Sequence, residues 1–341
     1  MAESVREIPP FVVDLTGNPA NHHAVRPTTR EWLTHAALFF LTVITTTIAG
    51  IVIAAPPIDL PEPPLATVID YLFYVPRYYL EIVFALLSFA FQHPRVLSEG
   101  LVFSATLLAI LTAHEFGHYV ACRRYGVNAT LPFFIPAPPL FLAGTFGAFI
   151  KIKSPIPSRR ALFDIGLAGP LAGFVVAVPV SVLGVLRMQA AASDTGYGIV
   201  FHDPLLFRLL GRLFSVPLDP YSLPNPYYMA AWIGLLVTSL NLMPVGQLDG
   251  GHGTFAVFGK RVHHLTGRIA FVTMAVLAVL GFFWHGSPSG FLYTVLLGVM
   301  LKVRHPQPAS LEPLGVARQI VAILTLIVFA LCFWPFPITI G

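Results

Sequence analysis

Residues 101–120 read LVFSATLLAILTAHEFGHYV, an apolar run with three ionisable side chains close to its end. About 20 apolar residues in a helix span the hydrocarbon core of a bilayer, and this run with its flanks is long enough. His114 and His118 are one helical turn apart and face the same way, with Glu115 beside them. Ionisable groups inside a membrane are costly, so this cluster indicates a functional site.

Two imidazoles at this spacing can bind one metal ion, while the adjacent glutamate reaches a water molecule that the metal activates. The pattern His-Glu-x-x-His on a helix is typical of zinc hydrolases. The competing interpretation is a pair of helix-packing histidines with a glutamate partner. The position of the cluster within an apolar run favours the metal site.

The composition is that of a polytopic membrane protein. Of the 341 residues, 56% are hydrophobic and 11% are charged, whereas soluble domains carry about 25% charged residues. The formal net charge of +4 is not interpreted as a sign of nucleic-acid binding. Cys122 and Cys332 allow at most one disulfide and fit no metal-ligand spacing.

Seven transmembrane helices are expected from the apolar segments, some of which need their flanks to reach full length. They lie at about 36–55, 100–122, 161–186, 228–245, 269–284, 291–301 and 320–333. Residues 68–91 are also apolar, but Asp70, Arg77 and Glu81 would be costly at the middle of the membrane. The second half of this segment is therefore interpreted as an interfacial or short embedded helix, with an eighth span as the alternative. Residues 204–214 are interpreted as another interfacial helix.

Residues 127–157 are apolar but so rich in proline and glycine that no straight helix can form. The end of this segment, residues 145–153, instead reads as a β-strand. Non-helical backbone at membrane depth is tolerated only against protein or a water-filled cavity. The expected fold is thus an all-α polytopic membrane protein, with about seven transmembrane helices and a re-entrant β-hairpin beside the metal.

A catalytic zinc ion usually has three protein ligands and a water, so the two histidines require a third ligand. Asp249 follows the fourth expected span at the same end of the membrane as His118, so its carboxylate can reach the metal. It lies between Pro244 and a Gly-Gly pair that is expected to end this helix. The competing role for Asp249 is a helix-terminal cap.

Two other acidic residues compete for the third position. Asp164 begins the third expected span, but it lies among helix-packing residues and can pair with Arg159 or Arg160. Glu99 lies at the opposite end of its span. Asp249 is therefore preferred. The other histidines near this region, His252, His263 and His264, are expected in loops without a ligand role.

The combined motifs resemble the site-2 protease family of intramembrane zinc metalloproteases, especially its members without a PDZ insert. The resemblance is carried by HEFGH at residues 114–118, by GTFGAFIKIKS at 144–154, by LAGPLAG at 167–173, and by NLMP and LDG around 241–250. It covers about residues 100–255. It implies cleavage of peptide bonds within or near the membrane-spanning segments of other proteins.

The resemblance also implies roles for single residues. His114, His118 and Asp249 would hold one zinc ion per chain, and Glu115 would be the general base. Asn241 would lie near the scissile carbonyl, although it could equally be an interhelical hydrogen-bonding residue. The strand would pair with an unwound substrate segment, and the expected substrate-binding residues are Gly144, Thr145, Phe146, Gly147 and Ala148.

The chain is divided accordingly into a cytoplasmic N-terminal tail (1–35), a first span with an interfacial segment (36–98), a catalytic membrane core (99–255) and C-terminal spans (256–341). Alternation through seven spans places most of the 20 lysines and arginines on the side of the N-terminus. The five exceptions are Arg77, Arg95, Arg187, Arg208 and Arg212. By the positive-inside rule, the N-terminus and the active site are expected toward the cytoplasm.

The N-terminal tail has neither the pattern of a secretory signal nor that of a transit peptide, which favours a prokaryotic plasma membrane over a plastid membrane. The expected partners are the lipid bilayer, a transmembrane protein substrate and an unidentified regulatory protein, but no nucleic acid.

Two alternatives stay open. A zinc protease of the CAAX-processing type would need a later glutamate as third ligand, and Glu312 in a proline-rich loop is the only one after Glu115. From another class, the chain could be a membrane transporter or a non-catalytic membrane scaffold.

Overall fold

The computed structural model describes residues 28–56, 58, 67–189, 199–218, 224–303 and 305–340. Most of the expected N-terminal tail lies outside these residues. Its last residues, from Thr29 on, already belong to the first helix, which begins with a capping box between Thr28 and Glu31.

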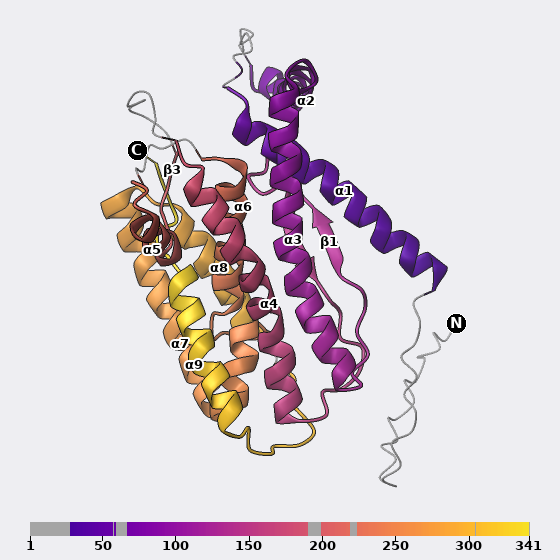
Figure 1. The fold of residues 1–341 in the computed structure, drawn as a ribbon, viewed down its shortest axis with the longest axis vertical. Helices are drawn as coiled ribbons and strands as arrows, with labels where there is room; N and C mark the ends of the chain where they lie inside the picture. Colours follow the sequence, from indigo (N-terminus) through magenta and orange to yellow (C-terminus); the bar gives the residue numbers. More distant parts are fainter. Residues whose placement is uncertain are drawn as a thin grey trace.

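Helices dominate the structure (Figure 1). They are α1 (Thr29–Ala54), α2 (Val68–Gln92), α3 (Pro94–Arg124), α4 (Arg159–Leu186), α5 (Leu205–Phe214), α6 (Pro226–Asn241), α7 (Asp249–His285), α8 (Ser289–Lys302) and α9 (Val316–Cys332). The strands are β1 (Phe133–Pro136), β2 (Thr145–Phe149), β3 (Ile199–Phe201) and β4 (Ile338–Ile340).

Five of the described helices are long and apolar enough to cross a membrane: α1, α2, α3, α4 and α7. The expected spans near 228–245, 291–301 and 320–333 are present as the shorter helices α6, α8 and α9, of 16, 14 and 17 residues. The membrane character is thus confirmed, while the count of seven spans is not. The short helix expected at 204–214 is confirmed as α5.

The helix at residues 68–91 is longer than the short embedded helix expected from the sequence, and the alternative of an eighth span stays open. Residues 68–92 form one continuous helix of 25 residues that runs through Pro76, and this helix is itself a candidate span. Its charges are accommodated locally: Asp70 caps the helix at Thr67, and Arg77 pairs with Glu81 one turn later at 2.7 Å. Because these groups satisfy each other on the helix surface, they do not interrupt the helix.

The core is built where α3, α4 and α6 pack together. Phe103, Leu107 and Ile110 of α3, Leu162 of α4 and Trp232 of α6 are almost completely buried and belong to one hydrophobic cluster. Figure 1 shows α3 and α4 side by side along most of their length. This packing brings the C-terminal half of α3, which carries the histidines, against the N-terminal half of α4.

The hairpin expected before α4 is present as an antiparallel pair of strands, β1 and β2, beside α1 and α3 (Figure 1). Phe133 pairs with Phe149 and Phe134 with Ala148. The ladder continues past β2, because Thr130 donates its amide to Lys151 and Lys153 donates its amide to Asn128. A second small sheet, not expected from the sequence, joins β3 to β4.

The segment after α6 differs from the expectation. The helix ends at Asn241, residues 242–248 form turns, and Asp249 is the first residue of α7. The Gly-Gly pair therefore begins a helix instead of ending one. The described histidines His252, His263 and His264 also lie in α7, not in loops. Gly259, with φ 81°, breaks α7, and Arg159 donates to the carbonyls of Ala256 and Val257 just before the break.

The helices α3 and α4 are in close contact at Gly117. A Cβ atom at this position would collide with the backbone carbonyl of Ala168. Because backbone cannot move aside cheaply, Gly117→Ala is expected to lower the free energy of unfolding by about 1–3 kcal/mol. Thermal unfolding of the purified protein in detergent measures this loss. Val120→Ala, at an exposed position of the same helix, is the control and should change stability little.

Candidate metal centre

Two buried histidines and a largely buried aspartate from two helices meet at one point. His114 and His118 project from α3, and Asp249 projects from the first turn of α7. The Nε2 atoms of the histidines are 3.1 Å apart, and Asp249 Oδ2 lies 3.3 Å from His114 Nε2 and 3.4 Å from His118 Nε2. Among the described residues, this is the group of three that could hold a metal ion.

These distances fit a zinc ion. In a tetrahedron with zinc–ligand bonds of about 2.0–2.2 Å, the ligand atoms are about 3.3–3.6 Å apart. The three sides of the observed triangle lie within a few tenths of an ångström of these values. Two nitrogens and one carboxylate oxygen are also a donor set that zinc accepts, and three protein ligands leave a fourth position open.

The ring of His118 is held in place by α4. Its Nδ1 donates to the carbonyl of Ile165 at 2.7 Å, which leaves the lone pair of Nε2 for the metal. Gly169 faces the same ring, and a Cβ atom there would collide with the imidazole. The glycines of the stretch 166–173, which the sequence indicates as helix packing, therefore serve in part to make room for the ligand.

Glu115 lies next to the triangle and is buried. Its Oε1 is 4.0 Å from His114 Nε2. The backbone amide of Ile150, just after β2, is within hydrogen-bonding reach of its carboxylate. A carboxylate at this distance from the metal position can exchange a proton with a water molecule there. The extended segment after β2 thus borders Glu115 as well as the histidines.

The group opens into a cavity of about 710 Å³. His114, Glu115, His118, Asp249 and Asn241 line it, together with the extended segment from Ala148 to Ile152. Asn241 Nδ2 lies 3.2 Å from His114 Nε2, so this amide is beside the ligand atoms.

Of the expected substrate-binding residues, the structure brings Asn241 and Ala148 to the cavity, but Gly144, Thr145, Phe146 and Gly147 do not line it. Thr145 is buried in the hairpin, where its hydroxyl donates to Ile135 at 2.7 Å. Phe146 is exposed and contacts Phe141.

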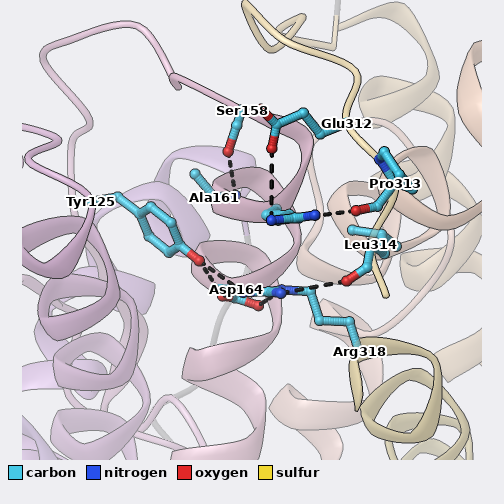
Figure 2. Close-up of polar contacts among 9 residues, drawn as sticks. Tyr125, Ser158, Ala161, Asp164, Glu312, Pro313, Leu314 and Arg318 are labelled. Carbon is cyan, nitrogen blue, oxygen red and sulfur yellow. Dashed lines mark hydrogen bonds and ion pairs between the residues drawn. The ribbon is translucent and has the colours of Figure 1, made fainter. Parts of the chain in front are cut away.

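Asp164, the competing ligand, is occupied elsewhere (Figure 2). Arg318 of α9 holds it in a bidentate pair, with Nε to Oδ1 at 2.8 Å and Nη2 to Oδ2 at 2.7 Å. Tyr125 donates its hydroxyl to the same carboxylate. The expected pairing of Asp164 with Arg159 or Arg160 is wrong. Arg159 donates to backbone carbonyls of α7. Arg160 donates to the carbonyl of Pro313 and pairs with Glu312 at 3.7 Å.

The structure adds one residue that the sequence did not indicate. His305 follows α8, and its Nε2 lies 2.9 Å from Nδ1 of His252, which lines the cavity. His305 Nδ1 donates to the carbonyl of Pro306 at 2.7 Å. Burial and then the neighbouring imidazoles lower the pKa of His305 to about 3, so the ring is neutral and accepts from His252. No spacing rule joins residues 53 positions apart, so only the fold could reveal this pair.

The third ligand can be tested by metal content. Asp249→Ala is expected to reduce bound zinc at least tenfold, because it removes one of three donors. Asp164→Asn is the matched control: it should loosen α9 from α4 and lower the melting temperature, but keep one zinc per chain. Atomic absorption of the purified variants measures both. Retained zinc in Asp249→Ala together with lost zinc in Asp164→Asn would reverse the assignment.

Comparison with known proteins agrees with this centre. A protein of Oryza sativa subsp. indica named "Probable zinc metalloprotease EGY2, chloroplastic" is 31% identical over 206 residues, which is 57% of this chain and 36% of that protein. "Probable zinc metalloprotease EGY1, chloroplastic" of Arabidopsis thaliana is 36% identical over 184 residues, 51% of this chain and 32% of that protein.

The chain thus spans about a third of the length of these curated relatives. No solved structure matches it. Residues 102–283, just over half of the chain, match peptidase family M50, and this region contains His114, Glu115, His118, Asn241 and Asp249. The chain belongs to peptidase family M50, the site-2 protease family of membrane zinc metalloproteases.

Proposed function

We propose that this chain is an intramembrane zinc protease that cleaves other proteins within or near their transmembrane segments. The observation that carries the proposal is the ligand triangle of His114, His118 and Asp249 beside Glu115, built on helices of membrane-spanning length. In this proposal the three residues hold one zinc ion, and Glu115 is the general base.

When bound at this position, zinc supplies Lewis-acid activation of water and of the scissile carbonyl. Glu115 removes a proton from the attacking water and later returns it to the leaving amine. Asn241, whose amide lies beside His114, donates a hydrogen bond to the substrate carbonyl and holds it toward the attacking water. His118 keeps its tautomer through the bond from Nδ1 to Ile165.

The substrate binds by adding a strand to the edge of the hairpin. A peptide bond inside a helix is already hydrogen-bonded and shielded, so a transmembrane substrate must unwind before it is cut. Strand addition gives the freed backbone new partners. The segment from Ala148 to Ile152 lines the cavity and supports this role directly. Residues Gly144, Thr145, Phe146 and Gly147 extend the same strand away from the metal position.

In the bilayer, the β1–β2 hairpin is re-entrant, and the shorter helices α6, α8 and α9 complete the spans. Since α2 is also a candidate span, eight spans now compete with seven. The end of α3 that carries Arg123 and Arg124 faces the cytoplasm, and the N-terminus lies on the same side in the seven-span arrangement. Residues 99–255 form the catalytic core between the N-terminal part (1–35 and 36–98) and the C-terminal spans (256–341).

The proposed partners are the bilayer, a single-span protein substrate and a regulatory protein. The relatives reported above are named as chloroplastic, so they lend no support to the expected prokaryotic plasma membrane. Either membrane is compatible with the proposed chemistry. A transporter or non-catalytic scaffold is not favoured, because the chain belongs to a protease family and has the three ligands and the base together.

The decisive experiment compares membrane-protein fragments in cells that carry the wild type or Glu115→Gln. This variant keeps the shape of the side chain but cannot accept the proton, so cleavage should fall by at least about a hundredfold while zinc stays bound. Uncut single-span proteins should accumulate. Glu99→Gln, the same change on the outer part of α3, should cleave like the wild type. Identical fragments in all three strains under every condition would contradict protease activity.

The role of Asn241 gives a second test. Asn241→Ala removes a hydrogen-bond donor beside the metal position but no ligand, so bound zinc should stay at one per chain while cleavage falls about tenfold or more. Zinc analysis and fragment quantification on the same preparations measure the two effects. A loss of zinc, or unchanged cleavage, would favour a role in helix packing.

A further inference from the structure

A second groove, of about 820 Å³, lies on another face of α3. Its walls come from α3, α4 and the start of α9, and it shares no lining residue with the active-site cavity. Most of its length is apolar and lined by small side chains, including Ala113, Ala168 and Ala172. Phe116 and Val120 on its α3 wall are 45% and 51% exposed, so in a membrane they contact lipid.

The groove ends in a polar mouth formed by Arg124, Tyr125, Asp164 and Arg318. Figure 2 shows how Arg318 is held there. Its guanidinium donates through Nε and Nη2 to Asp164, through Nη2 to Tyr125 at 3.0 Å, and through Nη1 to the carbonyl of Leu314 at 3.4 Å. A guanidinium has five N–H donors, so one on Nη1 is left for a ligand. These hydrogen bonds hold the Arg318 guanidinium in place before any ligand binds.

The charge of this mouth is positive. Asp164 is the acidic residue that lines the groove, and Arg318 neutralises it. Arg124 is exposed, and among the described residues it has no acidic partner within ion-pair distance. Arg123 adds a further positive charge next to it. The two arginines end α3 after its apolar stretch, which places them at the level of lipid headgroups.

We propose that this groove binds an anionic phospholipid. The acyl chain lies along the apolar walls, and the phosphate accepts hydrogen bonds from Arg124 and from the remaining Nη1 donor of Arg318. Basic pockets between transmembrane helices are suited to such headgroups. A substrate helix fits this mouth poorly, because transmembrane segments tend to carry their own lysines and arginines at the cytoplasmic end, and these would be repelled.

Lipid retention by the full-length protein tests the proposal. The purified protein is mixed in detergent with equal amounts of phosphatidylglycerol and phosphatidylcholine, and bound lipids are counted by native mass spectrometry. The wild type should retain one phosphatidylglycerol in preference to phosphatidylcholine. Arg124→Gln should weaken this binding about fivefold, the effect of one basic residue near an anionic headgroup. Arg261→Gln removes an exposed arginine from α7, outside the groove, and should bind like the wild type.

Two further experiments distinguish a bound phospholipid from other ligands of the groove. Ala172→Leu fills the apolar wall and should reduce retention although every arginine remains, whereas glycerol phosphate without acyl chains should not displace the lipid. Displacement by glycerol phosphate would show a phosphate site instead of a lipid site. Equal retention of the two lipids, or an Arg124→Gln variant that binds like the wild type, would overturn the proposal. A photoreactive residue at position 116 that crosslinks a single-span protein in place of lipid would also overturn it.

Discussion

The structure depends on the convergence of two imidazoles and one carboxylate inside an apolar bundle. Each group is costly in a membrane by itself, and together they form a donor set that a zinc ion can satisfy. The distances of 3.1–3.4 Å among the three ligand atoms require α3 and the start of α7 to approach closely. The helix α4 passes directly behind His118, where Gly169 provides the space. The small residues of α4 and the turn before α7 follow from this constraint.

A set of polar contacts at one end of the bundle keeps these helices in register. Arg159 at the start of α4 donates to carbonyls of α7, and Arg318 of α9 clamps Asp164 of α4. Both contacts join helix ends near the ligands, although neither touches the metal position. Because Asp164 is satisfied by Arg318 and Tyr125, it is an architectural residue, and the same cluster forms the mouth of the lipid-facing groove. The cavity at the candidate metal centre and this groove thus lie on two faces of a single helix.

Where the structure differs from the sequence expectations, the differences have a common physical cause. The charges of residues 68–91 are each costly alone, whereas Arg77 and Glu81 neutralise each other at helical spacing. The glycines after Asp249 are weak helix formers, yet they begin α7, where Gly250 and Gly251 pack against the backbone of residues 242–246. The partner of Asp164 comes from 154 residues further along the chain. In each case a contact between side chains or with packed backbone outweighed what the neighbouring residues in the sequence favour.

Local patterns in the sequence predict the membrane character, the helix with His114, Glu115 and His118, and the extended stretch that becomes β2. These features follow from composition and from the periods of 3.6 and 2 residues, which are local properties of the chain. The packing of the helices was needed to show that Arg318 and Tyr125 bind Asp164, that Ala148 but not Gly144 borders the cavity, and that His305 contacts His252. Those outcomes depend on how separate helices pack, and packing is decided by contacts between residues that no local pattern connects.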